Sequence, residues 1–406
     1  MTGSKVELSK ARCPVCGYGL ASPLFDGGHQ PLATLGWPGT LSEAKAMPRY
    51  PQEFVQCPQC THVWNRVFSY DVIPYEKNPM RMFNQGGIWQ GHMAATRDLM
   101  MSKMPASPTV IDVGCGDGDF ICRLADANQR QGRYIGFDVS TSDESGQGVE
   151  FYGRYFEPLT DVAAFQPDLI LMRHVLEHLT DPTGFLDQLA WAAGSLAKPL
   201  WFFAELPCID RALEHQRLAD FFYEHFSHFT EVSFGALMAR AGTIHTLGHG
   251  YDGEVLYALV QLHAPKGAEA RVGKSRDFAS LAEISVKEIS GQLDELACSG
   301  KRVAIWGGTG KAAAFINRFG ADAVRFPLVV ESDKVKVGSR VPGTGQTMEY
   351  RDVLKTTPVE VVIIPTQWRA KDIVAEMARE SIKPTQVLIE HEGRLVDFER
   401  DAHPYR

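Results

Sequence analysis

The chain has 406 residues, of which 44% are hydrophobic and 22% charged, and its formal net charge at pH 7 is −8. This length is sufficient for two or three domains, each with a core of its own. The acidic balance argues against a nucleic-acid partner, because phosphate binding needs a basic surface. No apolar run is long enough to span a membrane and no signal peptide is recognised, so we expect a cytoplasmic protein with no membrane partner.

Residues 1–70 are predicted to form a small zinc-binding module. Two C-x-x-C pairs supply its four candidate ligands, Cys13, Cys16, Cys57 and Cys60. Four thiolates can surround one Zn²⁺ tetrahedrally and leave no open position, so the expected role of the ion is structural. A pair of redox dithiols, or chance spacing, is the alternative.

Residues 71–265 are predicted to form the main domain, because strand-like and helix-like segments alternate along them. Such alternation favours a mainly parallel sheet with helices on both faces. The expected helices include 91–104 and 181–197. The expected strands are 109–113, 133–139, 149–152, 169–172, 200–205 and 256–262.

The stretch 110–120 reads Val-Ile-Asp-Val-Gly-Cys-Gly-Asp-Gly-Asp-Phe, a buried strand that ends in a turn with alternate glycines. Gly114, Gly116 and Gly118 permit positive φ and remove side chains from the surface that a ligand would approach. Asp138 ends the next expected strand, where a carboxylate can accept hydrogen bonds from both ribose hydroxyls of a nucleoside. The pattern predicts a cradle for such a ligand, and a turn without a ligand is the alternative.

The stretch 221–229, Phe-Phe-Tyr-Glu-His-Phe-Ser-His-Phe, is the candidate for acid–base chemistry. Tyr223, Glu224 and His225 place a phenol, a carboxylate and an imidazole in sequence, which are the ingredients of a general base near neutral pH. A buried histidine held within an aromatic lid is the alternative. Earlier in the chain, Glu177 and His178 are expected at a helix start or in a structural role.

Residues 266–300 are polar with apolar positions at helical spacing, and we expect a helix that links two domains. Residues 301–406 are predicted to form a second α/β domain, with strands at 302–306, 328–331, 359–365 and 387–389. Its first strand runs into Gly-Gly-Thr-Gly-Lys at 307–311. A phosphate or diphosphate could rest on the amides of this turn, with Lys311 adding charge, and a packing role without a ligand is equally open.

The first glycine turn resembles motif I of class I S-adenosylmethionine (SAM) methyltransferases. In that family the turn passes beneath the methionine part of the cofactor, and the strand acid, here Asp112, helps to hold its amino group. The resemblance implies a Rossmann-like doubly wound α/β fold with SAM as the cofactor. It assigns eight residues to the cofactor site: Asp112, Gly114, Cys115, Gly116, Gly118, Asp138, Tyr155 and His174.

Taken in order, the motifs resemble those of the sugar C-methyltransferases that act on nucleotide-linked 4-keto deoxysugars. That family joins a four-cysteine zinc module, a central SAM domain and a C-terminal Rossmann-like domain, and the resemblance covers nearly all of the chain. The matching segments are the four cysteines, 29–32 (His-Gln-Pro-Leu), 112–118, Asp138, 223–225 with 229–230, 253–255 and 307–311.

The resemblance implies methylation of carbon in a nucleotide-diphosphate sugar. A ketone at C4 acidifies the hydrogen on C3, a base removes it, and the resulting enolate attacks the methyl group of SAM. The resemblance makes His225 the base, with Glu224 orienting it or binding a hydroxyl. Tyr75 and Tyr223 are the other candidate catalytic residues, and the zinc takes no part in the chemistry.

Two other functions remain open. One is SAM-dependent methylation of oxygen or nitrogen in another small molecule, which needs a base but no acidified carbon. The other is a zinc-containing assembly protein without activity. The intact glycine triplet together with Asp138 disfavours this second alternative, because an inactive site has no reason to keep both.

Overall fold

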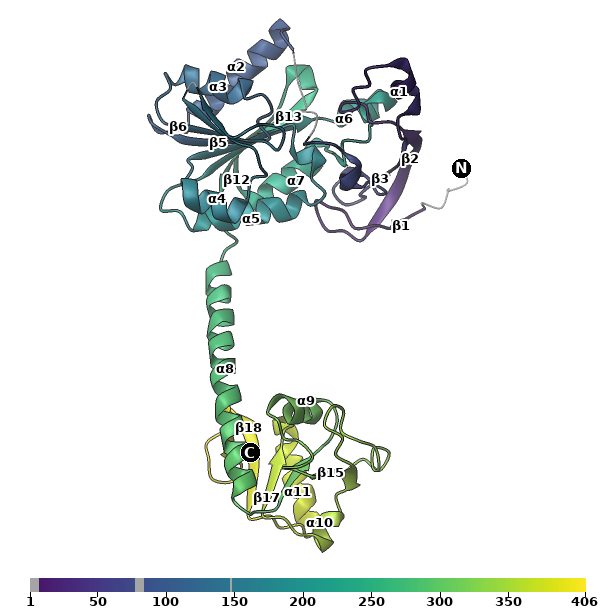
Figure 1. Cartoon of the computed structure of the whole chain (residues 1–406), viewed down its shortest axis with the longest axis vertical. Coiled ribbons are helices and arrows are strands. Elements are labelled where there is room, and N and C mark those ends of the chain that lie inside the picture. The colour runs from purple at the N-terminus through teal and green to yellow at the C-terminus, as the bar shows by residue number, and fades with distance from the viewer. Residues whose placement is uncertain (1–6, 77–83, 147) are drawn as a thin grey trace. The chain divides into compact units, whose positions relative to one another are not determined.

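The computed structural model describes residues 7–76, 84–146 and 148–406 (Figure 1). The chain divides into two units, one extending to Lys266 and the other running from Gly267 to Arg406. Among the helices in the described ranges, none combines the length and the apolar character that crossing a membrane requires.

The main sheet of the first unit has eight strands in the order β12-β13-β10-β9-β5-β6-β8-β7. Strands β10, β9, β5, β6 and β8 pair in parallel, whereas the pairs β10–β13, β13–β12 and β8–β7 are antiparallel. The strands are β5 (Thr109–Val113), β6 (Arg133–Phe137), β7 (Glu144–Gly146), β8 (Val149–Tyr152), β9 (Leu169–Arg173), β10 (Trp201–Pro207), β12 (Gly242–Gly250) and β13 (Val255–Leu262).

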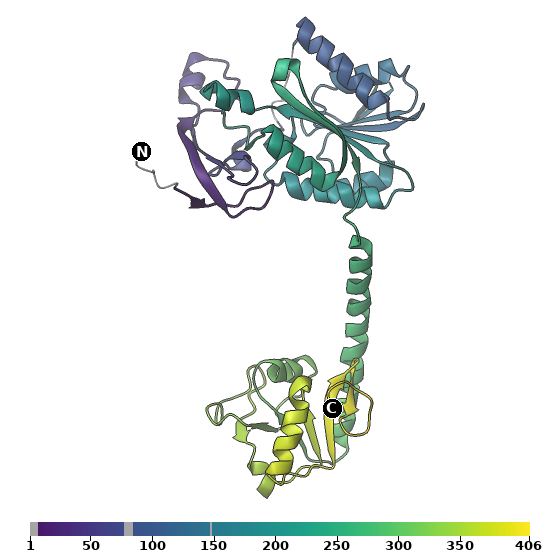
Figure 2. The same ribbon diagram turned by 180° about the vertical axis from the view of Figure 1, so that it is seen from behind.

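Helices cover both faces of this sheet (Figures 1 and 2). Helices α2 (Gly87–Met101) and α3 (Asp119–Ala127) lie on one face, and α4 (Pro158–Phe165), α5 (Pro182–Gly194) and α7 (Glu231–Ala241) on the other. Along β9, Leu169 and Leu171 pack with the first pair of helices, and Ile170 and Met172 with the second group. This alternation of buried side chains confirms the predicted α/β class with a doubly wound, Rossmann-like sheet.

The six strands expected in the main sheet are all present, but β7 and β12 were not predicted. The absence of a signal is clearest for β12. Its sequence, Gly-Thr-Ile-His-Thr-Leu-Gly-His-Gly, is mostly polar, because the strand lies at the edge of the sheet and is only partly buried. Periodicity therefore gives little signal for it.

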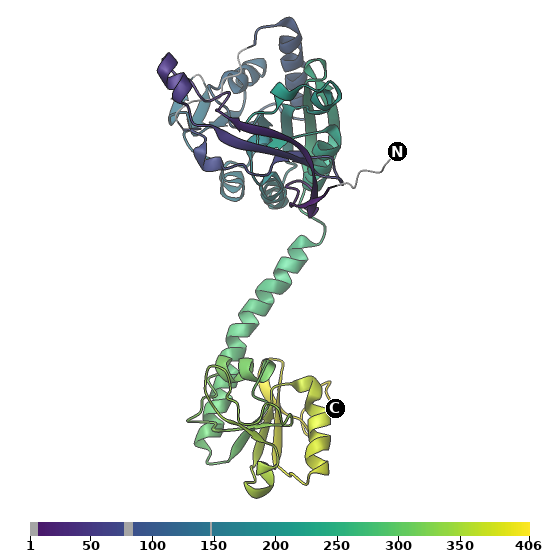
Figure 3. The same cartoon turned by 90° about the vertical axis from the view of Figure 1, so that its right-hand side faces the viewer.

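A second, antiparallel sheet is built around the cysteine pairs, in the order β1-β2-β3-β4-β11. Figure 3 shows its long hairpin crossing the first unit. Four strands come from the N-terminal segment: β1 (Ser9–Lys10), β2 (Leu20–Gln30), β3 (Tyr50–Gln56) and β4 (Val63–Asn65), with α1 (Leu41–Ala46) between β2 and β3. The fifth, β11 (Ser227–His228), comes from the main domain, between α6 (Asp210–Glu214) and α7 in the chain.

The second unit is another α/β sheet, ordered β16-β15-β14-β17-β18-β19, which is parallel except for β18–β19. Its strands are β14 (Val303–Trp306), β15 (Leu328–Glu331), β16 (Met348–Tyr350), β17 (Val361–Ile364), β18 (Gln386–His391) and β19 (Arg394–Asp397). Its helices are α8 (Ala268–Cys298), α9 (Lys311–Arg318), α10 (Val353–Thr356) and α11 (Ala370–Arg379). Helix α8 corresponds to the expected linking helix, and it buries Ile289 and Leu293 in the core of this unit.

Candidate active site

The glycine turn follows β5 and leads into α3, as its sequence predicts. Gly114, Gly116 and Gly118 have φ values of 72°, 57° and 75°, in the left-handed region that side chains disfavour. A Cβ on Gly114 would lie 2.4 Å from Val175 Cγ2, and one on Gly118 would lie 2.6 Å from the Phe151 ring. Two of the three glycines are therefore required by the protein's own packing as well as by backbone conformation.

Asp138 holds the turn from the end of the neighbouring strand. Its Oδ2 accepts a hydrogen bond from Gly116 N at 2.9 Å, and its Oδ1 accepts two from Ser140, at 2.8 Å from N and 2.6 Å from Oγ. A carboxylate has about four acceptor positions, so three are already used. Contact with both ribose hydroxyls, as the sequence suggests, would require one of these bonds to be exchanged.

Asp112 lies on β5 beneath the turn and is only 3% exposed. Burial raises the pKa of its carboxyl to about 7, against the opposing effect of Arg173 and with a further contribution from Asp138. The group therefore titrates near neutral pH, and a cation that entered the site would favour its charged form.

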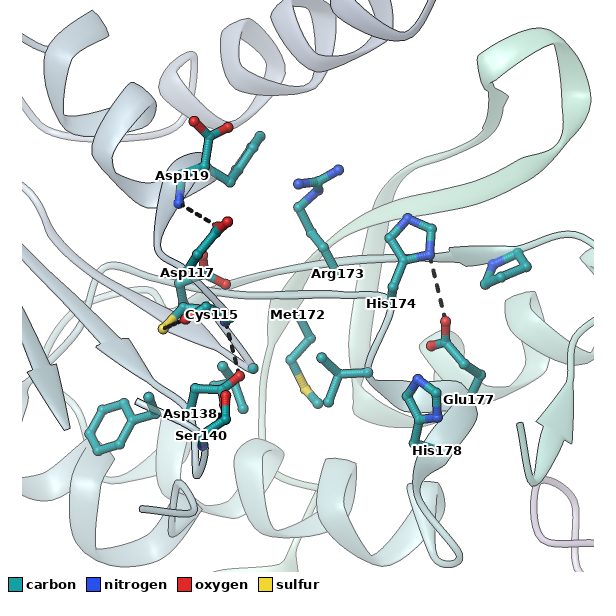
Figure 4. A pocket seen from close by; sticks show the side chains of 18 of the residues that line it. Cys115, Asp117, Asp119, Asp138, Ser140, Met172, Arg173, His174, Glu177 and His178 are labelled. Atoms are coloured by element: carbon teal, nitrogen blue, oxygen red, sulfur yellow. Dashed lines mark hydrogen bonds and ion pairs between the residues drawn. The ribbon is translucent and has the colours of Figure 1, made fainter. Parts of the chain in front are cut away.

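A cavity of about 1050 Å³ opens from this turn (Figure 4). Its volume lies at the upper end of the roughly 300 to 1,000 Å³ that is usual for small-molecule sites. The predicted residues that line it are Tyr75, Asp112, Gly114, Cys115, Gly116, Asp138, Tyr155, His174 and His225. Within the described ranges, its lining does not include the other three predicted residues, Gly118, Tyr223 and Glu224.

His225 is 7% exposed and lies between the rings of Phe222 and His178, at centroid distances of 4.1 and 4.9 Å. Burial, together with His178, His228 and His174, lowers the pKa of His225 well below its usual value. Its imidazole is therefore neutral at pH 7 and has a free lone pair, although the same burial makes it a weaker proton acceptor than an exposed histidine.

The cysteine module positions the stretch that carries His225. In β11, Ser227 and His228 pair with Trp64 and Val63 of β4. The chain on either side of β11 is also bonded to the module: Asn65 N donates to Phe226 O at 3.0 Å, and the hydroxyls of Thr61 and Thr230 share a hydrogen bond of 2.6 Å. The position of the imidazole therefore depends on a sheet whose other strands come from the N-terminal segment.

Glu224 anchors a loop of the module. Its Oε1 accepts hydrogen bonds from Thr34 N at 2.7 Å, Thr34 Oγ1 at 3.0 Å and Leu35 N at 3.1 Å. In the described part of the chain no hydrogen bond joins the Glu224 carboxylate to His225, so the expected direct orientation of the ring by this group is not seen.

Tyr223, like Glu224, is hydrogen-bonded to the N-terminal segment. Its hydroxyl accepts a hydrogen bond from Ser69 N at 2.9 Å, and its ring packs on Tyr50 and Phe68 at 5.0 and 5.3 Å. Like Glu224, it ties the 221–229 stretch to the N-terminal segment, away from the cavity surface.

Tyr75 and Tyr155 both reach the cavity. The Tyr75 hydroxyl donates to the carbonyl of Glu224 at 3.4 Å, and burial raises its pKa, so the phenol stays protonated and can donate to a ligand oxygen. Tyr155 is 52% exposed at the rim, where its hydroxyl meets that of Tyr70 at 3.3 Å.

A buried charge cluster behind His174 was not predicted from the sequence. Glu205, at 0% exposure, accepts hydrogen bonds from Arg173 at 2.7 Å and from His174 Nε2 at 3.2 Å, and it bonds to His92 Nε2 at 2.6 Å. Burial opposes its ionisation, but Arg173 and the two histidines keep the pKa of Glu205 well below its ordinary value. The sequence does contain one indication of this cluster. Glu205 ends the otherwise apolar expected strand 200–205, and a buried carboxylate needs partners.

His174 itself sits in a left-handed backbone conformation, with φ of 57°. Burial opposes its charged form, but the nearby carboxylates of Glu177 and Glu205 outweigh it and raise the pKa of His174. The strained backbone turns this imidazole into the cavity wall, as Figure 4 shows.

The four predicted zinc ligands come together. Sγ of Cys13 lies 3.6 Å from Sγ of Cys60, Sγ of Cys16 lies 3.5 Å from Sγ of Cys57, and all four sulfurs lie within 4.8 Å of one another. Zn–S bonds of about 2.3 Å in a tetrahedron place sulfurs about 3.8 Å apart, so the set fits Zn²⁺. None of the four forms a disulfide.

The second glycine turn, after β14, is covered by protein side chains at Gly308, whereas Gly310 has open space beside it. A Cβ on Gly308 would lie 2.4 Å from Met348 Sδ and 3.1 Å from Val341 Cγ2. Lys311 is bonded to Gln367 and lies 4.9 Å from the centre of the Trp368 ring. The packing role is the one that these contacts favour.

Comparison with solved structures finds methyltransferases. A SAM-dependent methyltransferase from Mesorhizobium loti is 16% identical, with 43% of this chain and 100% of that chain covered and a TM-score of 0.32. Magnesium protoporphyrin IX methyltransferase from Synechocystis PCC 6803, with bound SAH, is 14% identical over 45% of this chain and 90% of its own, with a TM-score of 0.32. A SAM-dependent methyltransferase from Aquifex aeolicus is 14% identical over 41% and 89%, with a TM-score of 0.30. A search of the curated proteins found no match.

Two family models match the sequence. Residues 89–243 match a methyltransferase domain, and residues 264–389 match the C-methyltransferase C-terminal domain. The chain is a SAM-dependent methyltransferase with the class I Rossmann-like fold. More particularly, the two matches together support a place among the SAM-dependent C-methyltransferases.

Proposed function

We propose that the protein transfers the methyl group of SAM to the carbon beside the ketone of a nucleotide-linked 4-ketosugar. One observation carries the proposal: the glycine turn with Asp112 and the neutral imidazole of His225 lie in the walls of the same cavity. The match to the C-methyltransferase C-terminal domain supports carbon as the acceptor. The sugar and its nucleotide are inferred from the resemblance of the whole chain.

The turn and its two acids would hold the cofactor. Bound SAM supplies an electrophilic methyl group. We assign Asp112 to its amino group, because a buried carboxyl with a pKa of about 7 gains most from a cationic partner. The backbone at Gly114 and Cys115 would lie beneath its methionine part, Asp138 and Tyr155 beside its nucleoside, and His174 on the opposite wall.

His225 is proposed as the proton acceptor. It takes the proton from the carbon beside the ketone, and the electron pair of that C–H bond moves into an enolate. The enolate carbon would then bond to the methyl group that SAM supplies as the bond from that methyl to sulfur breaks, and the sulfur would keep the electron pair and leave as S-adenosylhomocysteine. The Tyr75 phenol stays protonated, and it would donate to the enolate oxygen in exchange for its long hydrogen bond to the carbonyl of Glu224.

Glu224 and Tyr223 are proposed as positioning residues, because their hydrogen bonds go to the N-terminal segment. Zinc at Cys13, Cys16, Cys57 and Cys60 is proposed to be structural: it would stabilise the sheet that β11 completes, and with it the position of His225.

Deuterium exchange tests the reaction class. Incubation of the full chain with a nucleotide 4-ketosugar in D₂O, without SAM, should introduce deuterium at the carbon beside the ketone. Addition of methyl-labelled SAM should then give a product that carries the label on that carbon by mass spectrometry. Labelled product without any exchange would favour methylation of oxygen or nitrogen in its place.

The His225→Ala variant tests the base. We expect exchange and turnover to fall at least 100-fold while SAM affinity stays within twofold, because the imidazole lies apart from the glycine turn. His215→Ala is the matched control, since this histidine is exposed and its side chain contacts only Glu214 among the described ion pairs. Near-normal exchange in His225→Ala would refute the assignment.

A further inference from the structure

A second group of metal-ligand residues lies in the cavity wall. One ligand atom each of Glu177, His178 and His225 lies within 4.8 Å of the others, and all three residues are buried and line the cavity. Figure 4 shows Glu177 and His178 across the cavity from Cys115 and Asp138. Glu177 and His178 belong to the short 3-10 helix that follows β9, whereas His225 comes from the stretch that the cysteine module holds.

Glu177 has only one long contact where a buried carboxylate needs several close partners. It is 1% exposed, and within the described residues neither of its oxygens has a hydrogen-bond partner. It forms an ion pair with His174, whose Nδ1 lies 3.6 Å from Oε1, beyond hydrogen-bonding distance. A buried charge in this state costs several kcal/mol unless something pairs with it.

His178 presents a free lone pair to the same point. Its Nδ1 lies 2.7 Å from the carbonyl oxygen of Glu224, which can only accept, so Nδ1 carries the proton. Nε2 is therefore the unprotonated nitrogen of the neutral ring, and it is buried without a hydrogen-bond partner among the described residues. A backbone carbonyl that fixes the tautomer in this way is the usual support of a metal-binding histidine.

We propose that Glu177, His178 and His225 bind one divalent transition-metal ion. Metal–ligand bonds of about 2.0 to 2.2 Å place two ligands of one ion about 3 to 4 Å apart, so small side-chain rotations close the observed group around it. Two imidazoles and one carboxylate favour Zn²⁺, Mn²⁺, Co²⁺ or Fe²⁺ over Mg²⁺. Three protein ligands leave the remaining positions open to the cavity, in contrast to the closed set of four cysteines.

The ion and the proton then compete for His225. This part rests on the proposed function, because it assumes that the imidazole is the base. A lone pair bonded to a metal cannot accept a proton, so loading of the site should lower turnover while leaving the glycine turn free to bind SAM. The metal-free and metal-bound forms of the cavity would thus be the active and inactive forms of one site.

Manganese distinguishes this site from the cysteines, because Mn²⁺ binds thiolate-rich sites weakly and does not displace Zn²⁺ from them. The zinc-loaded full chain is titrated with MnCl₂, and free Mn²⁺ is followed by electron paramagnetic resonance. We expect one Mn²⁺ bound per chain, and at least tenfold weaker binding in Glu177→Gln and in His178→Asn. His249→Asn is the matched control, since it alters a different three-residue group, Cys208, Asp210 and His249, and should leave Mn²⁺ binding unchanged.

SAM affinity and the unfolding temperature, measured on each variant, show whether it is folded. Glu177→Gln keeps the shape of the side chain and removes a buried charge whose single ion pair, to His174, is long, so the unfolding temperature should change little. No Mn²⁺ binding by the wild type at millimolar concentration, or equal binding in both ligand variants, would overturn the site. Turnover that rises as Mn²⁺ binds would overturn the competition.

The two proposals fail separately. Mn²⁺ binding needs no sugar, so a chain that binds one Mn²⁺ but exchanges no deuterium contradicts only the proposed function. A chain that exchanges deuterium but binds no Mn²⁺ contradicts only the ion site.

Discussion

The two units carry the same arrangement at the end of their first central strands, with different outcomes. In each, a glycine turn joins a strand to a helix, β5 to α3 and β14 to α9, and an acid lies at the end of the adjacent strand. Around the first turn, Asp138 bonds to the turn itself and the backbone faces a cavity. Around the second, Glu331 accepts hydrogen bonds from the backbone of Ser332 and Asp333, and Met348 and Val341 lie against Gly308.

The difference shows what glycine in such a turn establishes. It indicates that the backbone passes close to something, and it leaves open whether that is a ligand or the protein's own side chains. Side chains lie against glycines of both turns, Val175 and Phe151 in the first and Met348 in the second. What separates the two cases is that Asp138 bonds to Gly116 and that a cavity opens from the first turn.

The largest effect is expected for Gly118→Ala. An alanine there would combine φ of 75° with a contact of 2.6 Å to the Phe151 ring, and strain of this kind costs about 1–3 kcal/mol. If the turn shifts to relieve this strain, SAM affinity, measured by calorimetry, should fall by up to about 100-fold, since about 1.4 kcal/mol is a factor of ten. Gly308→Ala is the matched change in the second turn and should leave SAM affinity unaltered. Equal losses in both variants would erase the distinction between the turns.

Asp138→Ala should come next. It removes the acceptor for Gly116 N and for Ser140, and hydrogen bonds to a charged group are worth about 1.5–3 kcal/mol. We expect a loss of SAM affinity of about tenfold or more. Glu331→Ala removes the corresponding acid of the second unit, and a comparable effect of that variant on SAM binding would contradict the comparison.

The pH dependence of SAM binding should follow Asp112. Its pKa of about 7 means that the carboxyl is neutral below that pH and charged above it, and only the charged form attracts the cofactor's ammonium. Affinity should therefore rise up to about tenfold per pH unit between pH 5.5 and 7, and this slope should disappear in Asp112→Asn.

The raised pKa of Asp112 should affect stability in the opposite direction: the free energy of unfolding should fall as pH rises, whereas SAM affinity should rise. Because the folded state binds this proton more tightly than the unfolded chain does, the stabilisation is greatest near pH 4 and is lost as pH rises through 7. Without SAM, Asp112→Asn should thus gain most over the wild type in thermal unfolding at pH 8. A difference that grows toward acid pH would contradict the assignment.

The smallest effect is expected for Lys311→Met in the second turn. Its ammonium is already bonded to Gln367 and lies over Trp368, which is 62% exposed, so the contacts are worth about 1 kcal/mol or less. SAM affinity should stay within twofold. A nucleoside diphosphate that protects the wild type from thermal unfolding, but not this variant, would show that the second turn binds phosphate after all.

Local patterns predicted much of this molecule. Alternating apolar segments located β5, β8 and β9 within a residue or so, because buried parallel strands read as continuous apolar runs. The spacing of the four cysteines indicated a metal site, and their sulfurs lie together. Glycine at 114, 116 and 118 indicated the turn, because few other residues tolerate its backbone conformation.

Long-range pairings could not be predicted in the same way. Nothing near Ser227 and His228 in sequence shows that they would join a strand near residue 63, or that Glu224 would bond to Thr34. The Glu205 cluster draws its partners from two separate stretches, His92 of α2 and Arg173 with His174 at the end of β9. Such contacts depend on the assembled fold, and a stretch of adjacent polar residues such as 223–225 gives no indication of which one faces the cavity.

The pairing of β11 with β4 has a consequence for how the protein is made. The two strands lie far apart in the sequence, so the ribosome finishes the cysteine-bearing segment long before its last strand exists. Until then β4 has an open edge, and newly bound zinc would sit in an incomplete structure. Recombination that exchanged only the cysteine module between two such enzymes would separate β4 from the strand it evolved with, so the two segments are expected to be inherited together.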